Sequence, residues 1–280
     1  MGVNRSAVAL ALALLLPLSA CTKGDERTES TAGPTFAQLE APVIVAHRGA
    51  GAQFPENTVY AMDHVAPYPT IIMDADVQQT SDGTLILNHD PTLDRVSGPL
   101  TGPVSGFTEA TWPTVPITWP SDSTWQPRPA VFGSTWKQLA DKWGGKRILS
   151  VEGKTPAAAS AVIADVVARG IQSRVVFNSF GLSQCRQAVE AGIAAVVAFP
   201  GVPDLDAAEA AGVWGVTLYA PYATKATLAD ANARGIKVLV LQVSNEEKME
   251  LYLSRGAYGF ATDYPFVLSG KPAPSDASLS

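Results

Sequence analysis

The feature that most constrains the fold is a repeated alternation of short, β-rich apolar runs with longer Ala-rich runs of helical pattern. Runs that are apolar throughout are typical of strands buried on both faces, so the alternation predicts a parallel sheet covered by helices. Five helical runs end in a glycine just before the next strand, which favours a left-handed helix C-cap. These glycines are Gly170, Gly192, Gly212, Gly235 and Gly256. The predicted strands are 43–46, 71–77, 84–88, 148–151, 174–177, 195–199, 215–218, 237–243 and 258–262; the main helices are 59–65, 134–143, 156–169, 182–191, 205–211, 225–234 and 245–254.

The second and third predicted strands must form a hairpin. Only Ser81-Asp82-Gly83 separates them, whereas a parallel crossover needs about a dozen residues or more. A turn near Asp82 predicts that His89 lies opposite Asp76. Without the return strand, eight parallel strands remain, so we expect an α/β fold: a TIM (β/α)8 barrel with an extra antiparallel hairpin strand. A doubly wound open sheet is the alternative.

The N-terminus has the layout of an export signal. Arg5 precedes an apolar run that is too short for a comfortable bilayer span and ends in Leu18-Ser19-Ala20-Cys21. This junction resembles the lipobox of bacterial lipoproteins, which implies cleavage before Cys21 and lipidation of its sulfur; a plain signal peptide with a fortuitous cysteine is the alternative. The predicted organisation is a signal peptide over 1–20, a lipidated tether over 21–40, a barrel over 41–271 and a tail over 272–280. We therefore expect an exported protein, lipid-anchored to the outer face of the bacterial cell membrane.

Charge and cysteine content narrow the partners of the mature chain. Removing residues 1–20 leaves 19 basic and 26 acidic residues, a net charge of −7, which argues against nucleic acid or a polybasic membrane contact. With Cys21 committed to lipid, the only other cysteine, Cys185, has no intrachain partner, and its helical setting predicts a buried, inert thiol. No protein partner is inferred.

Chemistry-bearing side chains gather at the ends of the first predicted strands. His47 follows the first strand, Asp74 and Asp76 lie on the second, and Glu152 follows the fourth. In barrels of this type the catalytic groups sit at the C-terminal ends of the strands. Because the hairpin folds His89 back toward the two aspartates, the sequence predicts one active site containing two of the chain's three histidines.

The order of these motifs resembles the glycerophosphodiester phosphodiesterase family, over residues 43–266. The resemblance implies a TIM barrel, a glycerophosphodiester as small-molecule substrate, and metal-dependent hydrolysis to glycerol phosphate and an alcohol. Two departures are Asp74, where the family usually has Glu, and a late strand that lacks the family's Trp. The motifs read His47-Arg48-Gly49, Pro55-Glu56-Asn57-Thr58, Asp74-Ala75-Asp76-Val77, Asp82-Gly83, His89-Asp90-Pro91-Thr92-Leu93-Asp94-Arg95, Glu152-Gly153-Lys154, Ser179-Phe180 and Thr262-Asp263-Tyr264-Pro265.

The chemistry of a phosphodiester explains why such residues belong together. Asp74, Asp76 and Glu152 offer hard oxygen ligands suited to one divalent cation, Ca²⁺ or Mg²⁺, and match the family's metal ligands. Arg48 and Lys154 can bind phosphate oxygens. The acid and base roles would be divided between His47 and His89, in an order that the sequence leaves open. The family motif also implies that Glu56 orients Arg48.

Several readings stay open at this point. Attack by a neighbouring substrate hydroxyl and direct attack by water are both compatible with the residues. Asn57 or Thr58 could cap the following helix, and Asp90 could either begin a turn or assist His89. We expect His64 to be a surface or packing residue. The alternative functions are a phospholipase-D-like or phosphoinositide-cleaving lyase, and a lipoprotein that binds phosphodiesters without cleaving them.

A long Trp- and Pro-rich insertion, about residues 91–146, separates the hairpin from the next strand. Loops of this length in compact domains tend to be functional. We therefore expect the insertion to form a lid, with Trp112, Trp119 and Trp125 as an aromatic wall for the alcohol part of the substrate. For Trp136 and Trp143, a satellite core beneath the insertion is an equal alternative.

Overall fold

The computed structural model describes residue 1 and residues 34–274. Cys21 and the proposed signal and tether segments therefore lie mostly outside the described residues, as does most of the predicted tail. Within residues 34–274, no helix has the length and apolar character needed to cross a membrane.

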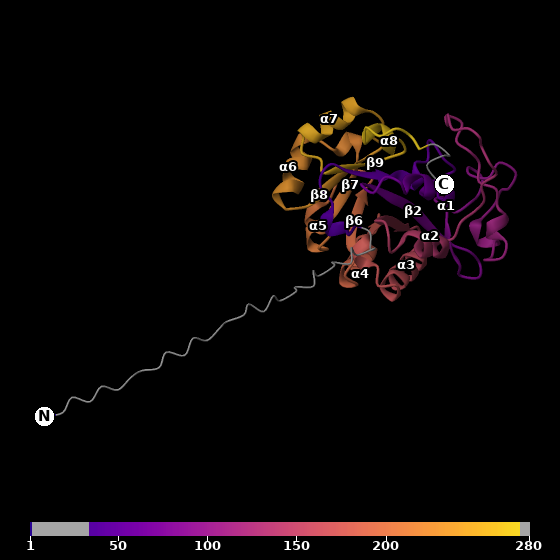
Figure 1. Cartoon of the computed structure of the whole chain (residues 1–280), viewed down its shortest axis with the longest axis horizontal. Helices are drawn as coiled ribbons and strands as arrows, with labels where there is room; N and C mark the ends of the chain where they lie inside the picture. Colours follow the sequence, from indigo (N-terminus) through magenta and orange to yellow (C-terminus); the bar gives the residue numbers. More distant parts are fainter. Residues whose placement is uncertain (2–33, 275–280) are drawn as a thin grey trace. The chain divides into compact units, whose positions relative to one another are not determined.

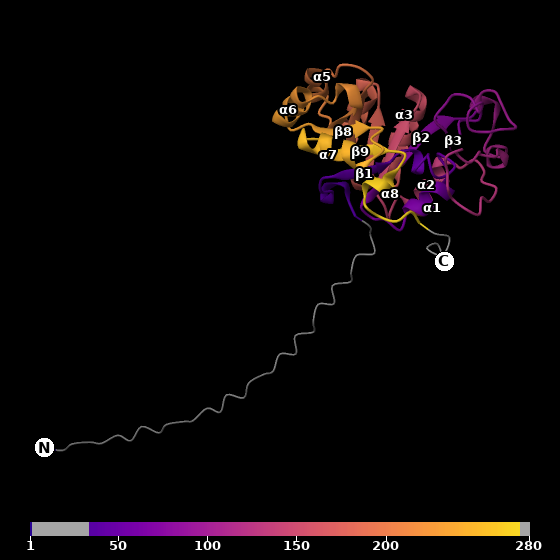
Figure 2. The same cartoon turned by 90° about the horizontal axis from the view of Figure 1, so that it is seen from above.

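Eight parallel strands close into a barrel within this region, which confirms the predicted fold. The barrel closes because the first strand pairs with both the second and the last, through Ile44 with Ile71 and Ile44 with Phe260. Figures 1 and 2 show the helices arranged around the outside of these strands. The strands are β1 (Val43–Ala46), β2 (Ile71–Gln79), β4 (Leu149–Gly153), β5 (Val175–Ser179), β6 (Ala194–Phe199), β7 (Gly215–Tyr219), β8 (Lys237–Leu241) and β9 (Gly259–Thr262).

The helices follow their sequence signals closely. All five predicted C-cap glycines have positive φ, from +66° at Gly170 to +98° at Gly256. Thr58 caps the first helix by accepting a hydrogen bond from the backbone N–H of Ala61, which settles the choice between Asn57 and Thr58. The helices are α1 (Val59–Val65), α2 (Trp136–Trp143), α3 (Pro156–Ala168), α4 (Leu182–Glu190), α5 (Leu205–Ala210), α6 (Lys225–Ala233), α7 (Glu246–Ser254) and α8 (Pro265–Leu268).

The strands separate two apolar regions because successive side chains point to opposite faces. On β1, Ile44 and Ala46 pack in the large core with the helices, whereas Val43 and Val45 belong to a second cluster with strand residues such as Val176. Cys185 on α4 is buried with a free thiol, as predicted.

The predicted hairpin is present, but its register differs by one residue from the prediction. Strand β3 (Leu85–Leu87) is antiparallel to β2, and Val77 pairs with Leu87. The three-residue loop 81–83 ends in Gly83 at φ +83°, so the pairing places Asn88 opposite Asp76: the Asn88 N–H donates to the Asp76 carbonyl at 3.0 Å. The predicted pairing of His89 with Asp76 is wrong. Because the three-residue loop is centred on Asp82, Thr80 lies opposite Thr84, and every later pair, including Asp76 with Asn88, follows from that register.

The insertion lies beside the barrel, next to α1 in both views and next to β3 in Figure 2. Trp112 is fully buried in a separate core with residues such as Leu93 and Val115, and its indole N–H donates to the Ser134 carbonyl. Trp119 and Trp125 pack edge-to-face against the buried Phe54. Trp136 belongs to the main core.

His64 is a packing residue. It is fully buried on α1, stacked on the Phe54 ring with the centroids 4.5 Å apart, and its Nδ1 lies 2.8 Å from the Tyr60 carbonyl oxygen. The expected alternatives for this histidine were packing or surface exposure, and the structure selects packing.

Candidate active site

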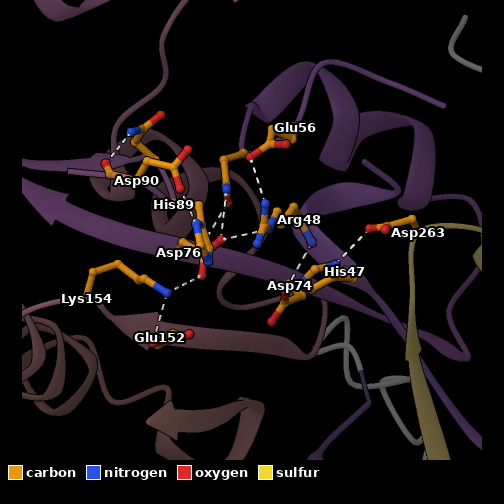
Figure 3. Close-up of polar contacts among 12 residues, drawn as sticks. His47, Arg48, Glu56, Asp74, Asp76, His89, Asp90, Glu152, Lys154 and Asp263 are labelled. Carbon is orange, nitrogen blue, oxygen red and sulfur yellow. Dashed lines mark hydrogen bonds and ion pairs between the residues drawn. The ribbon is translucent and has the colours of Figure 1, made fainter. Parts of the chain in front are cut away.

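The C-terminal ends of β1, β2 and β4 bring the predicted catalytic residues together. His47 and Arg48 begin the turn after β1, and Asp76 on β2 pairs directly with Glu152 on β4. A cavity with about 880 Å³ of empty space, part of it open to solvent, opens here. Figure 3 shows the side chains converging from these segments. The charged residues that line the cavity are His47, Arg48, Asp74, Asp76, His89 and Glu152.

Asp74 is held by hydrogen bonds from two sides. The backbone N–H of Arg48 donates to its Oδ2 at 3.0 Å, and the Ser150 hydroxyl donates to its Oδ1 at 2.6 Å. Arg48 reaches this position in the left-handed backbone region, at φ +54°, which is uncommon for a non-glycine residue and typical of functional sites. Burial raises the pKa of Asp74 despite the opposing charge of His47.

Asp76 is fixed by Asn57. The Asn57 side-chain amide donates to Asp76 Oδ2 at 3.0 Å and accepts from the Asp76 backbone N–H at 2.9 Å. Although burial opposes ionisation, the charges of Lys154 and Arg48 hold the pKa of Asp76 below its ordinary value. Asp76 is therefore an ionised carboxylate inside the site at neutral pH.

The pKa of Glu152 is shifted in the opposite direction to that of Asp76. Burial, followed by the negative charge of Asp76, raises its pKa to about 7. The Lys154 ammonium partly offsets this repulsion, with Nζ 3.0 Å from Glu152 Oε1 and 3.6 Å from Asp76 Oδ1. The side chain of Lys154 is only 12% exposed, so it is part of the site and not a solvated loop residue.

Each of the two site histidines carries a carboxylate on the same ring nitrogen. His47 Nδ1 lies 2.7 Å from Asp263 Oδ1, and His89 Nδ1 lies 2.6 Å from Asp90 Oδ1. The second contact places the Asp90 carboxylate where it could assist His89. A carboxylate on Nδ1 fixes the ring and leaves Nε2 for proton exchange with a ligand.

The pKa of His47 reflects this pairing. Burial alone would lower it, but the hydrogen bond to Asp263 and the charge of Asp74 outweigh burial and raise the pKa above 6.5. For Asp90, burial again opposes ionisation, while the hydrogen bonds with His89 and Arg95 lower its pKa.

Arg95 links the carboxylates that contact Arg48 and His89. Arg95 donates to both oxygens of Glu56, at 2.6 and 2.8 Å, and to Asp90 Oδ2 at 2.7 Å. Glu56 in turn accepts from Arg48 at 3.3 Å, which places it where it can orient Arg48. One guanidinium thus contacts the carboxylate partner of His89 and that of Arg48.

Sequence reasoning overlooked several supporting residues. Asp263 and Arg95 lie within the sequence motifs, but the motifs alone did not predict their contacts with the histidines and carboxylates. Asn57 was predicted only as a possible helix cap. The positive φ of Asn57, +54°, frees its side chain to face Asp76. Ser150 was not singled out, although it lies two residues before Glu152 and on the same face of β4.

The insertion does not supply the predicted aromatic wall. Among the described residues that line the cavity, the aromatic ones are Phe36, Phe180, Trp214 and Tyr219, none of which belongs to residues 91–146. The aromatic wall predicted from Trp112, Trp119 and Trp125 is wrong, because none of the three lines the cavity. Trp112 is fully buried in a separate core, and the half-buried Trp119 and Trp125 pack on Phe54.

The carboxylates of the site are candidate ligands for a cation. Within residues 34–274, no three His, Cys, Asp or Glu side chains are grouped so as to hold a metal ion by themselves. The donor set nevertheless suits a hard cation, since Asp76 and Glu152 occupy paired positions on β2 and β4 and burial, followed by the charge of Asp76, raises the pKa of Glu152. In the structure, the Lys154 ammonium provides the neutralising charge.

Comparison with known proteins points to one family. Residues 47–267 match the model of the glycerophosphoryl diester phosphodiesterase family. A glycerophosphodiester phosphodiesterase from Bacillus subtilis is 31% identical over 84 residues, which are 30% of this chain and only 25% of that protein. The matched stretch thus spans a quarter of this curated relative's length.

Solved structures share the fold at low sequence identity. A glycerophosphoryl diester phosphodiesterase from Parabacteroides distasonis has a TM-score of 0.68 at 19% identity, covering 88% of this chain and 92% of that one. An Oleispira antarctica phosphodiesterase in complex with the product sn-glycerol-3-phosphate has a TM-score of 0.67 at 22% identity, covering 82% and 96%.

Proposed function

The chain belongs to the glycerophosphoryl diester phosphodiesterase family, and from this premise we propose that it hydrolyses glycerophosphodiesters to glycerol phosphate and an alcohol. The observation that carries the proposal is the pair of carboxylate-bound histidines, His47 with Asp263 and His89 with Asp90, on one cavity. Phosphodiester cleavage needs a proton acceptor for the nucleophile and a proton donor for the leaving alkoxide. Two fixed imidazoles meet both needs.

The phosphate group would be bound between Arg48 and Lys154. Within the described residues, the buried Nε of Arg48 makes no hydrogen bond, and the nearest carboxylate oxygen, Asp76 Oδ2, is 3.5 Å away. An unpaired buried donor costs stability unless a ligand uses it. A phosphate oxygen would satisfy this N–H, while Glu56 holds the other end of the guanidinium.

The nucleophile is either water or a neighbouring hydroxyl of the substrate's glycerol. The second route gives a cyclic phosphate that water then opens. Both routes place the same demands on His47 and His89, because each requires one proton to be removed and one to be donated. The proposal therefore does not depend on which histidine is acid and which is base.

We further propose that Asp74, Asp76 and Glu152 hold one Ca²⁺ or Mg²⁺ ion. The support is their all-oxygen chemistry, their burial and the repulsion between Asp76 and Glu152. When bound, the ion would supply positive charge that stabilises the developing negative charge on phosphorus-bound oxygen. Calcium titration by calorimetry should show one site in the wild-type chain and a lower affinity in Asp76→Asn; equal binding by both would remove Asp76 from the ligand set.

Choline release from glycerophosphocholine tests the function. We expect release by the purified protein, loss of release on exhaustive chelation, and recovery on adding Ca²⁺ or Mg²⁺. Release that persists without metal would refute the metal dependence while leaving the phosphodiesterase intact. Accumulation of a stable cyclic phosphate would favour a lyase, and binding without turnover would favour a phosphodiester-binding lipoprotein.

The cellular location is also a proposal. The Leu18-Ser19-Ala20-Cys21 junction supports cleavage and lipidation at Cys21, which would tether the barrel to the outer face of the cell membrane. The net charge of −7 expected for the mature chain opposes adsorption to anionic lipid.

A further inference from the structure

The cavity continues below the catalytic groups toward the N-terminal end of the barrel. Its lining includes Val43, the first residue of β1, and Trp214, which directly precedes β7, as well as His47 and Tyr219 at the opposite strand ends. Val43 and His47 are four positions apart along β1 and its end, roughly 13 Å for an extended chain. The hollow therefore follows the barrel interior instead of stopping at the catalytic groups.

The walls of this deep part are apolar and incompletely packed. Val45, Ile72 and Leu239 face the cavity and keep 3–5% exposure. The interior of such a barrel is ordinarily filled by bulky branched side chains. Although Val196 of β6 packs in the inner cluster, the cavity lining that comes from β6 and β9 is limited to the methyl groups of Ala198 and Ala261, so room remains beside them.

Charge is confined to one half of the cavity. All charged lining residues come from the segments around β1, β2, β3 and β4. Among the described lining residues on β6 to β9 and their following turns, every side chain is uncharged, as at Tyr219, Leu241 and Ala261. A charged headgroup entering that half would lose hydration without gaining an ionic partner, whereas an apolar group gains by leaving water.

An aromatic floor closes the deep end. The rings of Phe36 and Trp214 meet edge-on with centroids 4.6 Å apart, and Trp214 meets Tyr258 at 5.2 Å. Phe36 lies in the short 3-10 helix Phe36–Gln38 that precedes β1. The rings of Phe36 and Trp214 offer an apolar surface at the end of the hollow, and the Lys237 ammonium lies beyond them over the Tyr258 ring, 5.3 Å from its centroid.

We propose that the barrel interior is a binding site for an aliphatic chain carried by one alcohol of the phosphodiester. The phosphate would remain at the catalytic groups while the chain extends between Val45, Leu239 and Ala261 toward the aromatic floor. This inference rests on the proposed phosphodiesterase function and specifies its substrate class. The preferred substrates are glycerophosphodiesters of apolar alcohols.

A chain-length series tests the proposal in the wild-type protein. Steady-state kinetics with the ethyl, butyl and hexyl esters of glycerol phosphate, and with glycerophosphoglycerol as the polar reference, should show KM falling by up to about fourfold per methylene. The kcat value should change little, because the chain is bound equally in the ground and transition states. Equal kcat/KM across the series would overturn the chain site but leave the phosphodiesterase standing. No turnover of any ester would instead refute the proposed function.

Filling the hollow tests its location. Ala261→Leu should lower the ratio of kcat/KM for the hexyl ester to that for the ethyl ester by about tenfold or more, since replacing the methyl group by isobutyl adds three carbons that occupy the volume of several methylenes. Ala198→Leu provides a second, independent position if Ala261→Leu does not fold. Ala210→Leu, the same change at an exposed site on α5, should keep the wild-type ratio. An unchanged ratio in folded Ala261→Leu and Ala198→Leu would contradict the assignment.

Discussion

His47 and Asp263 are 216 residues apart in sequence, yet His47 Nδ1 lies 2.7 Å from Asp263 Oδ1. The contact exists because β1 and β9 are neighbours in the closed barrel, with Ala46 paired to Thr262. Barrel closure thus completes one of the two histidine–carboxylate pairs. His89 and Asp90, by contrast, are adjacent in sequence and need no closure to meet.

Asp263→Asn should lower the pKa of His47. The wild-type pKa is raised above 6.5, since the hydrogen bond to Asp263 and nearby negative charge outweigh burial. Because the folded-state pKa is raised, the pair stabilises the fold fully at pH values below 6.5 and loses this contribution as the pH rises through the folded pKa. NMR titration of the His47 imidazole measures the change; an unaltered midpoint in Asp263→Asn would show that the contact does not control His47.

Arg95→Gln should lower kcat by about 10- to 100-fold while the protein stays folded. Arg95 contacts Glu56 and Asp90, the carboxylates that position Arg48 and His89. Its removal should also displace the pH dependence of kcat, because Asp90 loses a neighbouring cation. Arg234→Gln is a matched control, since Arg234 likewise joins surface carboxylates, Asp206 among them. If both variants had wild-type kcat and pH profiles, Arg95 would have no positioning role.

Trp112→Ala should destabilise the protein by about 3–5 kcal/mol, the usual cost of removing a large aromatic side chain from a core. The indole is fully buried and its N–H is hydrogen-bonded to Ser134. Ratios of kcat/KM among substrates should stay constant in the folded fraction, because Trp112 does not line the cavity. Thermal melts paired with kinetics on two substrates provide the test, and altered ratios at unchanged stability would restore the lid hypothesis.

Cys21→Ala should abolish membrane retention without reducing the specific activity of the folded protein. A thioether-linked lipid contributes about 0.8 kcal/mol per buried methylene, and the acidic mature chain has no equivalent contact. Cell fractionation followed by an activity assay measures both properties. Equal membrane retention of wild type and Cys21→Ala would contradict the lipid anchor.

Local patterns were sufficient to predict most of the barrel. The alternation of apolar and helical runs and the glycines at helix ends are local signals within one helix–strand unit. Glycines such as Gly170 and Gly256 therefore predict helix ends without any tertiary information. The grouping of Asp74, Asp76 and Glu152 also follows from strand ends, because parallel strands present their C-termini on one face. Their side-chain contacts, however, depend on Asn57, Ser150 and Lys154, which local pattern could not place.

The errors came from properties that tertiary packing decides. The pairing of Asp76 with Asn88 depends on the conformation of a three-residue loop. A one-residue error in this register assigns the side chains of the paired strand to the opposite face of the sheet. Pro-rich sequence correctly indicated irregular backbone around Trp119 and Trp125, but it gave no information on which surface the indoles cover. They pack on Phe54, beside the histidine of α1.

The most direct test of the central claim is phosphorus NMR of glycerophosphocholine incubated with wild-type protein, His47→Ala and His89→Ala. Acid and base groups contribute about 10²- to 10⁴-fold each, so glycerol phosphate should accumulate with the wild type and form at least about 100-fold more slowly with either variant. Circular dichroism should show that both variants are folded. Absence of glycerol phosphate with the wild type, or wild-type rates in the two folded variants, would contradict paired-histidine cleavage of a glycerophosphodiester.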